Sequence, residues 1–200
     1  MTGARPRGFT LIELLIVVAI IAILAAIAVP NFLEAQTRAK VSRVHSDMRT
    51  LATGIEAYSV DNNSYPLNGV LATGGMLQNP QVVGAVPQAH KFLYQGITSP
   101  VAYIVSLPGD PFVRDPLPYE AWKPYWHLYF YTNFDWFQKI SGPNPPPVIE
   151  QKKTRYGVWV MCGCGPDGDR LDLNRDLYYD PTNGTVSDGD IMRSPRIVSW

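Results

Sequence analysis

The chain lacks the residue groupings on which most enzymatic sites depend. Its three histidines, His45, His90 and His127, are isolated in the sequence, and no Ser-His-Asp or Cys-His arrangement or glycine-rich phosphate loop is evident. An excess of one charge is also missing, because 17 basic residues balance 17 acidic ones. This balance gives no electrostatic case for binding nucleic acid. We therefore predict a protein that is not an enzyme, has no certain cofactor and has no nucleic-acid partner.

Cysteine is scarce. The two cysteines, Cys162 and Cys164, lie two residues apart on an expected strand, where a disulfide between them would be strained. A C-x-C pair with no second pair and no neighbouring histidine is also a weak metal or redox signal. We expect both to be small buried core residues, with redox or metal chemistry as the less favoured alternative.

The sequence contains one long apolar run near its N-terminus. From Phe9 to Val29 the chain carries a single ionisable side chain, Glu13, and neither glycine nor proline. A helix of this length spans roughly 30 Å, about the hydrocarbon thickness of a bilayer. A core helix of a soluble domain seldom stays apolar on every face for so long. The run therefore predicts a membrane-spanning helix.

The flanks of the run predict its orientation. Arg5 and Arg7 precede it, and no Lys or Arg follows until Arg38. Because positive flanks stay in the cytoplasm, the C-terminal bulk should be exported. A cleavable secretory signal is the alternative, since Ala26-Ile27-Ala28 matches a signal-peptidase pattern. Two features favour the anchor: the run is longer than a usual signal core, and it contains Glu13, whose carboxylate is costly in lipid without a partner.

The residues that open the run resemble a known signal. The segment Arg7-Gly8-Phe9-Thr10-Leu11-Ile12-Glu13-Leu14-Leu15 is similar to the class III signal of type IV pilins and type II secretion pseudopilins. The resemblance implies that a prepilin peptidase cuts between Gly8 and Phe9 and methylates the new amino group of Phe9. It also implies that Glu13 pairs with the Phe9 amine of a neighbouring subunit, and that Pro30 breaks the helix ladder.

The sequence beyond Pro30 predicts an amphipathic continuation of the helix. Apolar residues recur every three or four positions, at Val41, Val44, Met48, Leu51, Ile55 and Tyr58. We interpret this stripe as the face that packs on the globular domain, and expect the Asn-rich residues 61–63 to end the helix. The expected domains are a leader (1–8), a transmembrane and assembly helix (9–30), an amphipathic stalk helix (31–62) and an exported globular αβ domain (63–200).

The globular part is rich in turn-forming and aromatic residues. Residues 119–137 hold ten of the 23 aromatics. We expect strands at 126–131 and 155–162, in a small antiparallel sheet that packs against the long helix and precedes a loop-rich C-terminal region. This is an α+β fold, which the resemblance identifies as the pilin fold. The inward-facing aromatics should be core, whereas a carbohydrate or protein patch stays open for the rest. Leu107–Phe112 resembles an element that leads into the sheet of major pseudopilins.

An Asp-rich segment is the one candidate metal site. Seven Asp and two Arg lie between positions 167 and 190, a density of oxygen ligands that suits calcium, although the spacing does not fit an EF-hand. Residues 165–168 and 187–191 resemble the two ends of the calcium loop of major pseudopilins, with an apparent insertion and a hairpin turn at 182–185 between them. Solvated Asp-rich turns are an equal alternative. The implied ligands of the one Ca²⁺ are Asp167 and Asp190, with Asp169 or Asp188.

These features predict a structural subunit of a type II secretion pseudopilus. It should sit in the bacterial inner membrane by a single pass, with its N-terminus in the cytoplasm and its globular domain in the periplasm, and then join a filament. The expected partners are other pilin-like subunits, the prepilin peptidase, the inner-membrane assembly platform and membrane lipid. Two alternatives stay open: a type IV pilin for adhesion or motility, and a membrane-anchored carbohydrate- or protein-binding module. The sequence does not distinguish a major from a minor subunit, nor name a secreted substrate.

Overall fold

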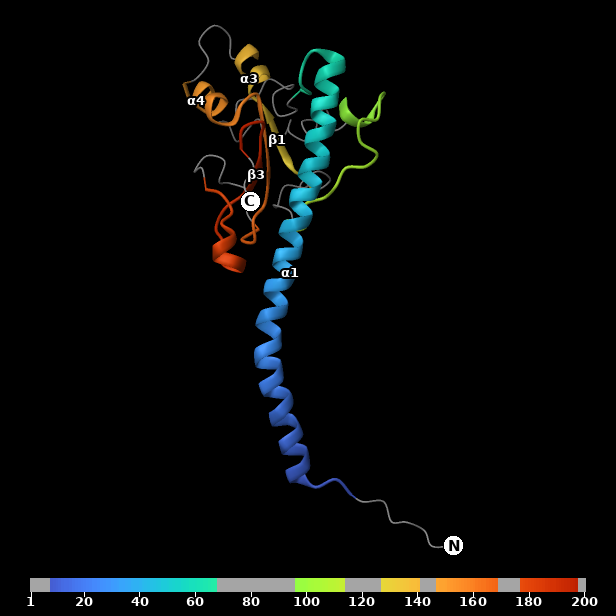
Figure 1. The fold of residues 1–200 in the computed structure, drawn as a ribbon, viewed down its shortest axis with the longest axis vertical. Coiled ribbons are helices and arrows are strands. Elements are labelled where there is room, and N and C mark those ends of the chain that lie inside the picture. The colour runs from blue at the N-terminus through green and yellow to red at the C-terminus, as the bar shows by residue number, and fades with distance from the viewer. Residues whose placement is uncertain (1–7, 68–95, 114–126, 141–146, 169–176, 198–200) are drawn as a thin grey trace, which may run out of the picture.

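One long helix dominates the molecule. The computed structural model describes residues 8–67, 96–113, 127–140, 147–168 and 177–197. Helix α1 (Leu11–Asn62) has 52 residues, which at about 1.5 Å per residue makes it about 78 Å long. Its first half projects alone, and the globular domain packs along its second half (Figure 1). The α+β arrangement expected from the sequence is confirmed.

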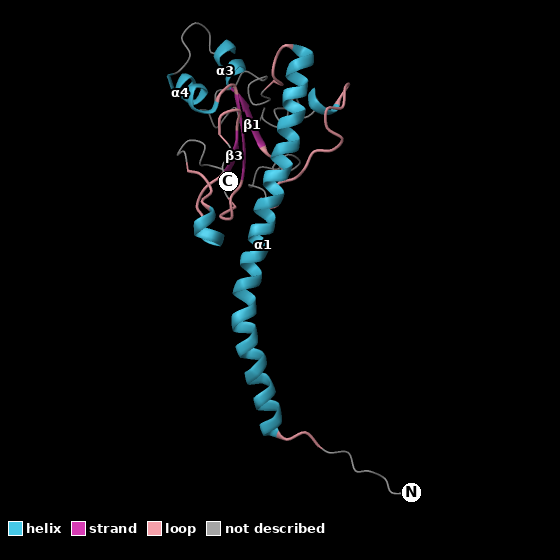
Figure 2. Cartoon of the chain, viewed as in Figure 1, coloured by secondary structure: helices cyan, strands magenta, loops and turns pink. Residues whose placement is uncertain are grey.

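Helix α1 is continuous through Pro30. The expected break at this residue is not seen, because the residues on both sides remain helical and the helix only curves gently (Figure 2). Proline lacks the N–H that would donate to the carbonyl four residues earlier, so one hydrogen bond is lost without ending the helix. The segments expected at 9–30 and 31–62 therefore form one element. Asn63, with a φ of 48°, caps its C-terminal end within the Asn-rich stretch, as predicted.

The amphipathic stripe on α1 is confirmed as the face that packs on the domain. Its buried members are Val41, Val44, Met48, Leu51 and Ile55. Tyr58 is partly buried against the same core cluster. Gly54 lies on this face, and a Cβ there would come within 2.7 Å of Cγ2 of Ile104. The segment around Ile104 thus packs directly on the backbone of the helix, at a point where no larger residue fits without displacement.

A three-stranded antiparallel sheet lies beside this stripe. The strands are β1 (Phe130–Asn133), β2 (Trp159–Gly163) and β3 (Ile191–Arg193), with β2 in the centre. Cys162 of β2 lies opposite Phe130 on one side and Met192 on the other. Helices α3 (Phe134–Ile140) and α4 (Pro147–Tyr156) supply a second core cluster with β2, through Phe134, Ile149 and Tyr156. The sheet is therefore covered by α1 on one face and by α3 and α4 on the other.

Both expected strands are misplaced at their starts. The strand expected at 126–131 begins only at Phe130, and Leu128 forms an isolated bridge with Gly109. The strand expected at 155–162 begins at Trp159, because the preceding residues belong to α4. Gly157, with a φ of 92°, makes the turn between α4 and β2, a conformation that glycine adopts readily.

The cysteines and the inward-facing aromatics of the described stretch are core residues, as expected. Cys162 and Cys164 are buried free thiols, and they belong to the two different core clusters. Tyr129, Tyr131 and Phe134 are each at most 3% exposed. The aromatics at 119–126 lie outside the described residues. For the described part of the aromatic stretch, packing of the sheet against its covering helices accounts for the burial.

Candidate assembly site at the N-terminus of α1

The first half of α1 presents apolar side chains in every direction. All residues from 8 to 33 are exposed, and the leucines and isoleucines among them are more than half exposed. An 18-residue window reaches a mean hydropathy of 3.1, so the helix is long and apolar enough to cross a membrane. Each exposed apolar side chain is unfavourable in water by about 1.5–3 kcal/mol relative to burial. This half of α1 therefore requires lipid or other apolar helices around it, and it anchors the chain in a membrane.

Thr10 and Glu13 form a capping box at the start of this helix. The Thr10 hydroxyl oxygen accepts the Glu13 backbone N–H at 3.3 Å. The Glu13 carboxylate in turn accepts the Thr10 N–H at 2.8 Å and the Thr10 hydroxyl at 2.7 Å. These bonds satisfy helix N–H groups that have no partner inside the helix. They also give the one acid of the apolar run a partner within its own chain.

The Thr10 contact is a functional detail that our sequence reasoning missed. We expected the helix to start at Phe9, whereas it begins at Leu11 with Thr10 as its N-cap. The spacing Thr-x-x-Glu is the sequence signal of a capping box, so this contact could have been predicted from the sequence. The expected pairing of Glu13 with the Phe9 amine of a neighbouring subunit stays a prediction.

The expected cleavage site lies just before the first helical turn. Gly8 and Phe9 are non-helical and exposed, and a Cβ at Gly8 would meet no atom within 4 Å. A peptidase can therefore reach this bond without unwinding the helix. Cutting there would create an amine on Phe9, next to the Thr10 N–H that holds the Glu13 carboxylate. The leader at 1–7 lies outside the described residues.

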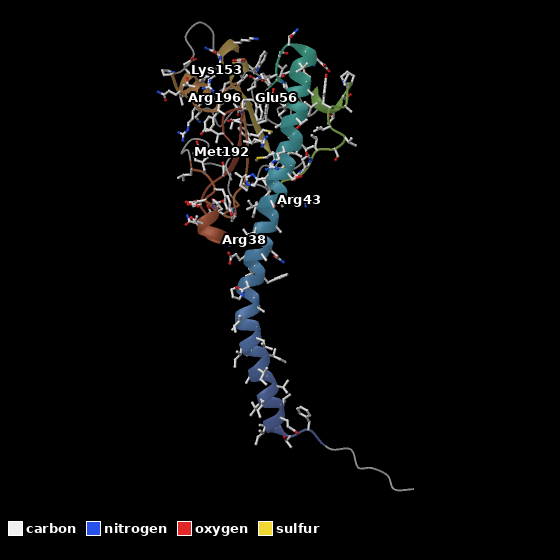
Figure 3. All side chains as sticks on the ribbon, in the orientation of Figure 1. Arg38, Arg43, Glu56, Lys153, Met192 and Arg196 are labelled. Carbon is white, nitrogen blue, oxygen red and sulfur yellow. The ribbon has the colours of Figure 1, made fainter. Side chains whose placement is uncertain are left out.

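Carboxylates on the second half of α1 fix the globular domain to the helix. They accept hydrogen bonds from aromatic side chains, in the pairs Asp47–Tyr129 (3.0 Å), Glu56–Trp159 (2.9 Å) and Asp61–Tyr103 (2.9 Å). Figure 3 labels Glu56 on the upper part of α1. Burial raises the pKa of the Tyr129 hydroxyl, and the nearby acids Asp110 and Asp47 raise it further, so this hydroxyl stays a donor. The helix and the domain are thus held as one unit by polar as well as apolar contacts.

Asp110 fastens the Leu107–Phe112 element to the end of β2. Its buried carboxylate accepts the N–H of Phe112 at 2.9 Å and the N–H of Cys164 at 2.7 Å. Room for this contact exists because Gly163 has no side chain: a Cβ there would lie 2.9 Å from the Tyr129 ring and 3.0 Å from the Asp110 carboxylate. Hydrogen bonds to a buried charge are among the stronger polar contacts in proteins. The role of Asp110 is therefore structural.

The structure brings together part of the expected calcium site. The Asp167 carboxylate accepts the Gly189 N–H at 3.2 Å, and the neighbouring Asp190 is fully buried. A buried carboxylate favours a nearby cation. Asp188 is exposed, and Asp169 lies outside the described residues. Within the described residues, no group of three His, Cys, Asp or Glu side chains is placed to hold a metal.

The turn expected at 182–185 is not a hairpin. Residues Pro181–Val186 form a 3₁₀ helix, η4, whose N-cap is Asp180. The Asp180 carboxylate accepts the N–H of Thr182 at 2.8 Å, which starts the helical turn. The flanking residues do not form an antiparallel pair, because Tyr178 bridges Asp190 in the parallel sense. Helix η4 lies beside α1, which it contacts.

An exposed apolar helix of membrane length, capped by Thr10 and Glu13 and carrying a small α+β domain, defines a pilin-like protein. A family model described as the prokaryotic N-terminal methylation motif matches residues 4–29. The type II secretion system core protein G of Pectobacterium carotovorum is 33% identical over 116 residues, which cover 57% of this chain and 67% of that protein. The chain belongs to the family of type II secretion system core protein G.

Other relatives agree with this placement. The type II secretion system core protein G of Aeromonas hydrophila is 31% identical over 124 residues, or 62% of this chain and 78% of that protein. The type IV major pilin protein PilA of Myxococcus xanthus is 51% identical over 61 residues, or 30% of this chain and 28% of the pilin. No solved structure gives a significant match.

Proposed function

We propose that this chain is a structural subunit of a type II secretion pseudopilus, a helical filament that aids protein export. The observation that carries the proposal is the exposed apolar half of α1, capped by Glu13, in a member of the core protein G family. Such a helix has two stable surroundings, which are lipid before assembly and sister helices after it. The work of the protein is mechanical, and it needs no catalytic group of its own.

The sequence of events follows from the chemistry of the N-terminus. The precursor sits in the inner membrane, with its basic flank in the cytoplasm and its globular domain in the periplasm. The prepilin peptidase cuts between Gly8 and Phe9 and methylates Phe9. The Glu13 carboxylate then exchanges or shares its Thr10 contacts with the positively charged Phe9 amine of a neighbour, a favourable pair in an apolar setting. Transfer from lipid into a helical bundle loses little apolar burial, so an inner-membrane assembly platform can drive the step.

A type IV pilin is the second candidate. The PilA match is higher in identity but spans 61 residues, whereas the secretion relatives match over 116 and 124 residues. A relationship that extends beyond the N-terminal half of the chain favours the pseudopilus. A membrane-anchored binding module is favoured by no observation, because the described aromatics of the sheet are buried in the core.

Analysis of the mature N-terminus tests the processing step. Mass spectrometry of the protein purified from membranes should find a chain that begins at N-methylated Phe9. The variant Gly8→Leu should stay unprocessed, because it replaces the glycine of the resembled signal directly before the proposed cut with a bulky side chain. The variant Ala28→Leu should be processed normally. A mature chain that begins at Val29, with processing blocked only in Ala28→Leu, would contradict the proposal and support a secreted soluble protein.

We also propose that Asp167 and Asp190, with Asp188 or Asp169, bind one calcium ion. The support is the proximity of the Asp167 carboxylate to Gly189 and the complete burial of Asp190 beside it. An ion that binds only the folded state at a concentration of about 100 Kd stabilises it by about 2.7 kcal/mol.

Thermal melts with calcium and with a chelator test the calcium proposal. For a domain of this size we expect calcium to raise the melting temperature by about 5–10 °C. Asp190→Asn should remove this increase, whereas the exposed N-cap variant Asp180→Asn should keep it. Coincident melts of the wild type with and without calcium would show that the Asp residues are solvated turns.

A further inference from the structure

A groove with basic walls runs between α1 and the segment that leads into η4. It has a volume of about 440 Å³, and Tyr179 and Pro181 form its outer wall. The α1 wall carries Arg38, His45 and Arg49, which lie on one face of the helix because they are seven and four residues apart. Figure 3 shows Arg38 on α1 at the level of η4. Among the residues that the structure describes, no Asp or Glu lines the groove.

The positive charges around the groove are only partly neutralised. Arg38 pairs with Glu34 on its own helix at 2.5 Å. In contrast, neither Arg49 nor Arg193 of β3 has an ion-pair partner among the residues that the structure describes. Asp180, which directly precedes η4, is engaged as its N-cap through Thr182. The groove is thus a local excess of positive charge in a chain whose formal net charge is zero.

His45 lies half-buried between these charges. Its Nε2 atom is buried and has no hydrogen-bond partner within the described part of the chain. Burial lowers the pKa of His45, and the nearby Arg49 and Arg193 lower it further. Because the folded pKa lies below the unfolded one, the neutral form of His45 favours folding, and this contribution is lost as the pH falls from about 6.5 through the lower pKa of the folded state. If an anion were bound between these groups, protonation of His45 would stabilise the folded protein instead of destabilising it.

We propose that this groove is a binding site for an oxyanion, held by the guanidinium group of Arg49 together with the protonated imidazole of His45, both of which line it. Guanidinium forks match the geometry of carboxylate, sulfate and phosphate oxygens. Protonation of His45 adds a positive charge to the wall of the groove, and Arg193 adds a further positive charge nearby. The burial of Tyr179 raises the pKa of its hydroxyl, so this wall of the groove adds no negative charge.

A lipid headgroup is not the source of the anion. His45 lies 15 residues beyond Pro30, or about 22 Å along the helix. The headgroup layer extends only about 5–8 Å beyond the hydrocarbon core. Two sources with the same chemistry remain, namely a free anion of the exported compartment and an acidic side chain of a neighbouring copy. The choice between them rests on the proposed function, whereas the existence of the site does not.

Sulfate binding to the full chain in detergent micelles tests the site. Sulfate keeps its charge across the relevant pH range, and sodium chloride at equal ionic strength is the control for screening. We expect saturable binding that weakens about tenfold or more in Arg49→Gln, which loses a charged hydrogen bond, and less in Arg193→Gln, which loses only a nearby positive charge. The matched control Lys139→Gln removes an exposed cation outside the groove and should bind sulfate as the wild type does.

The pH dependence separates this site from a merely basic surface. Binding should strengthen between about pH 7.5 and pH 5.5 in the wild type, as His45 becomes protonated, and should be independent of pH in His45→Gln. Two results would overturn the proposal: no saturable binding by the wild type, or an equal loss in Lys139→Gln and in the groove variants.

Assembled filaments identify the source of the anion. If filaments no longer bind sulfate and Arg49→Glu reduces assembly, a neighbouring copy fills the groove with a carboxylate. If filaments bind sulfate as well as micellar subunits do, the ligand is a free anion. A failure of the proposed function can be told from a failure of the anion site. If only the proposed function is wrong, no filaments form but sulfate still binds to the subunits in micelles.

Discussion

Replacing Glu13 with glutamine should abolish filament assembly and leave a folded protein in the membrane. Glutamine keeps an oxygen that can accept the Thr10 N–H, so the cap at the start of α1 survives. It lacks the negative charge that would pair with the Phe9 amine of the next subunit. Breaking such a pair in an apolar setting costs about 3–5 kcal/mol, which lowers the equilibrium constant for each added subunit more than a hundredfold. Electron microscopy of sheared filaments, with immunoblots of membrane fractions, measures the outcome.

Two control variants separate charge from capping. Glu34→Gln removes a partly exposed carboxylate of the same helix, whose ion pair with Arg38 is a surface pair, and it should assemble as the wild type does. Thr10→Ala removes the N-cap while keeping the charge of Glu13, and it should cost about 1 kcal/mol and reduce assembly mildly. Normal filament yield from Glu13→Gln would show that the charge has no part in assembly.

Replacing Asp110 with alanine should destabilise the globular domain severely. The carboxylate is 6% exposed and accepts the N–H groups of Phe112 and Cys164. Its loss leaves two N–H groups without acceptors, and each such buried group costs about 1–3 kcal/mol. The expected loss is about 3–5 kcal/mol, a large fraction of the stability of an ordinary domain. Denaturant unfolding followed by tryptophan fluorescence would measure it.

Asp180→Ala is the matched control for Asp110→Ala. Asp180 makes the same local contact, because its carboxylate accepts the N–H of the residue two positions on, Thr182. It is exposed, however, and the released N–H can bond to water. We expect a loss of about 1 kcal/mol or less, typical of an exposed cap. Equal destabilisation by both variants would mean that the Cys164 contact and burial add nothing at Asp110.

The long helix was predictable because its signals are local and periodic. The run from Phe9 to Val29 and the stripe from Val41 to Ile55 follow a fixed spacing that a single helix imposes. Asn63 ends α1 by adopting a conformation that asparagine tolerates. These features require no knowledge of what the rest of the chain does.

The second core layer was less predictable because its signals are mixed. We expected a strand from Arg155 and predicted no helix directly before it. Pro147 instead occupies the first turn of α4, a position where proline is well tolerated, and Arg155 closes that helix. The Thr-Asn-Gly-Thr run predicts a hairpin, but Asp180 and Pro181 before it start a 3₁₀ helix. In both places the residues that precede the local signal decided which element formed.

The contacts of the candidate site were hidden for a different reason. Thr10 and Glu13 are three residues apart, so their capping box could have been predicted from the spacing. The bond from Trp159 to Glu56 joins positions 103 residues apart, and no single sequence places them together. The basic groove likewise depends on β3 and η4 returning to α1.

The uninterrupted course of α1 through Pro30 has a mechanical consequence. The lipid-facing half and the domain-bearing half lie on one continuous helix, in which Pro30 removes a single hydrogen bond. We therefore expect a displacement of the N-terminal end along the helix axis to move the globular domain with it.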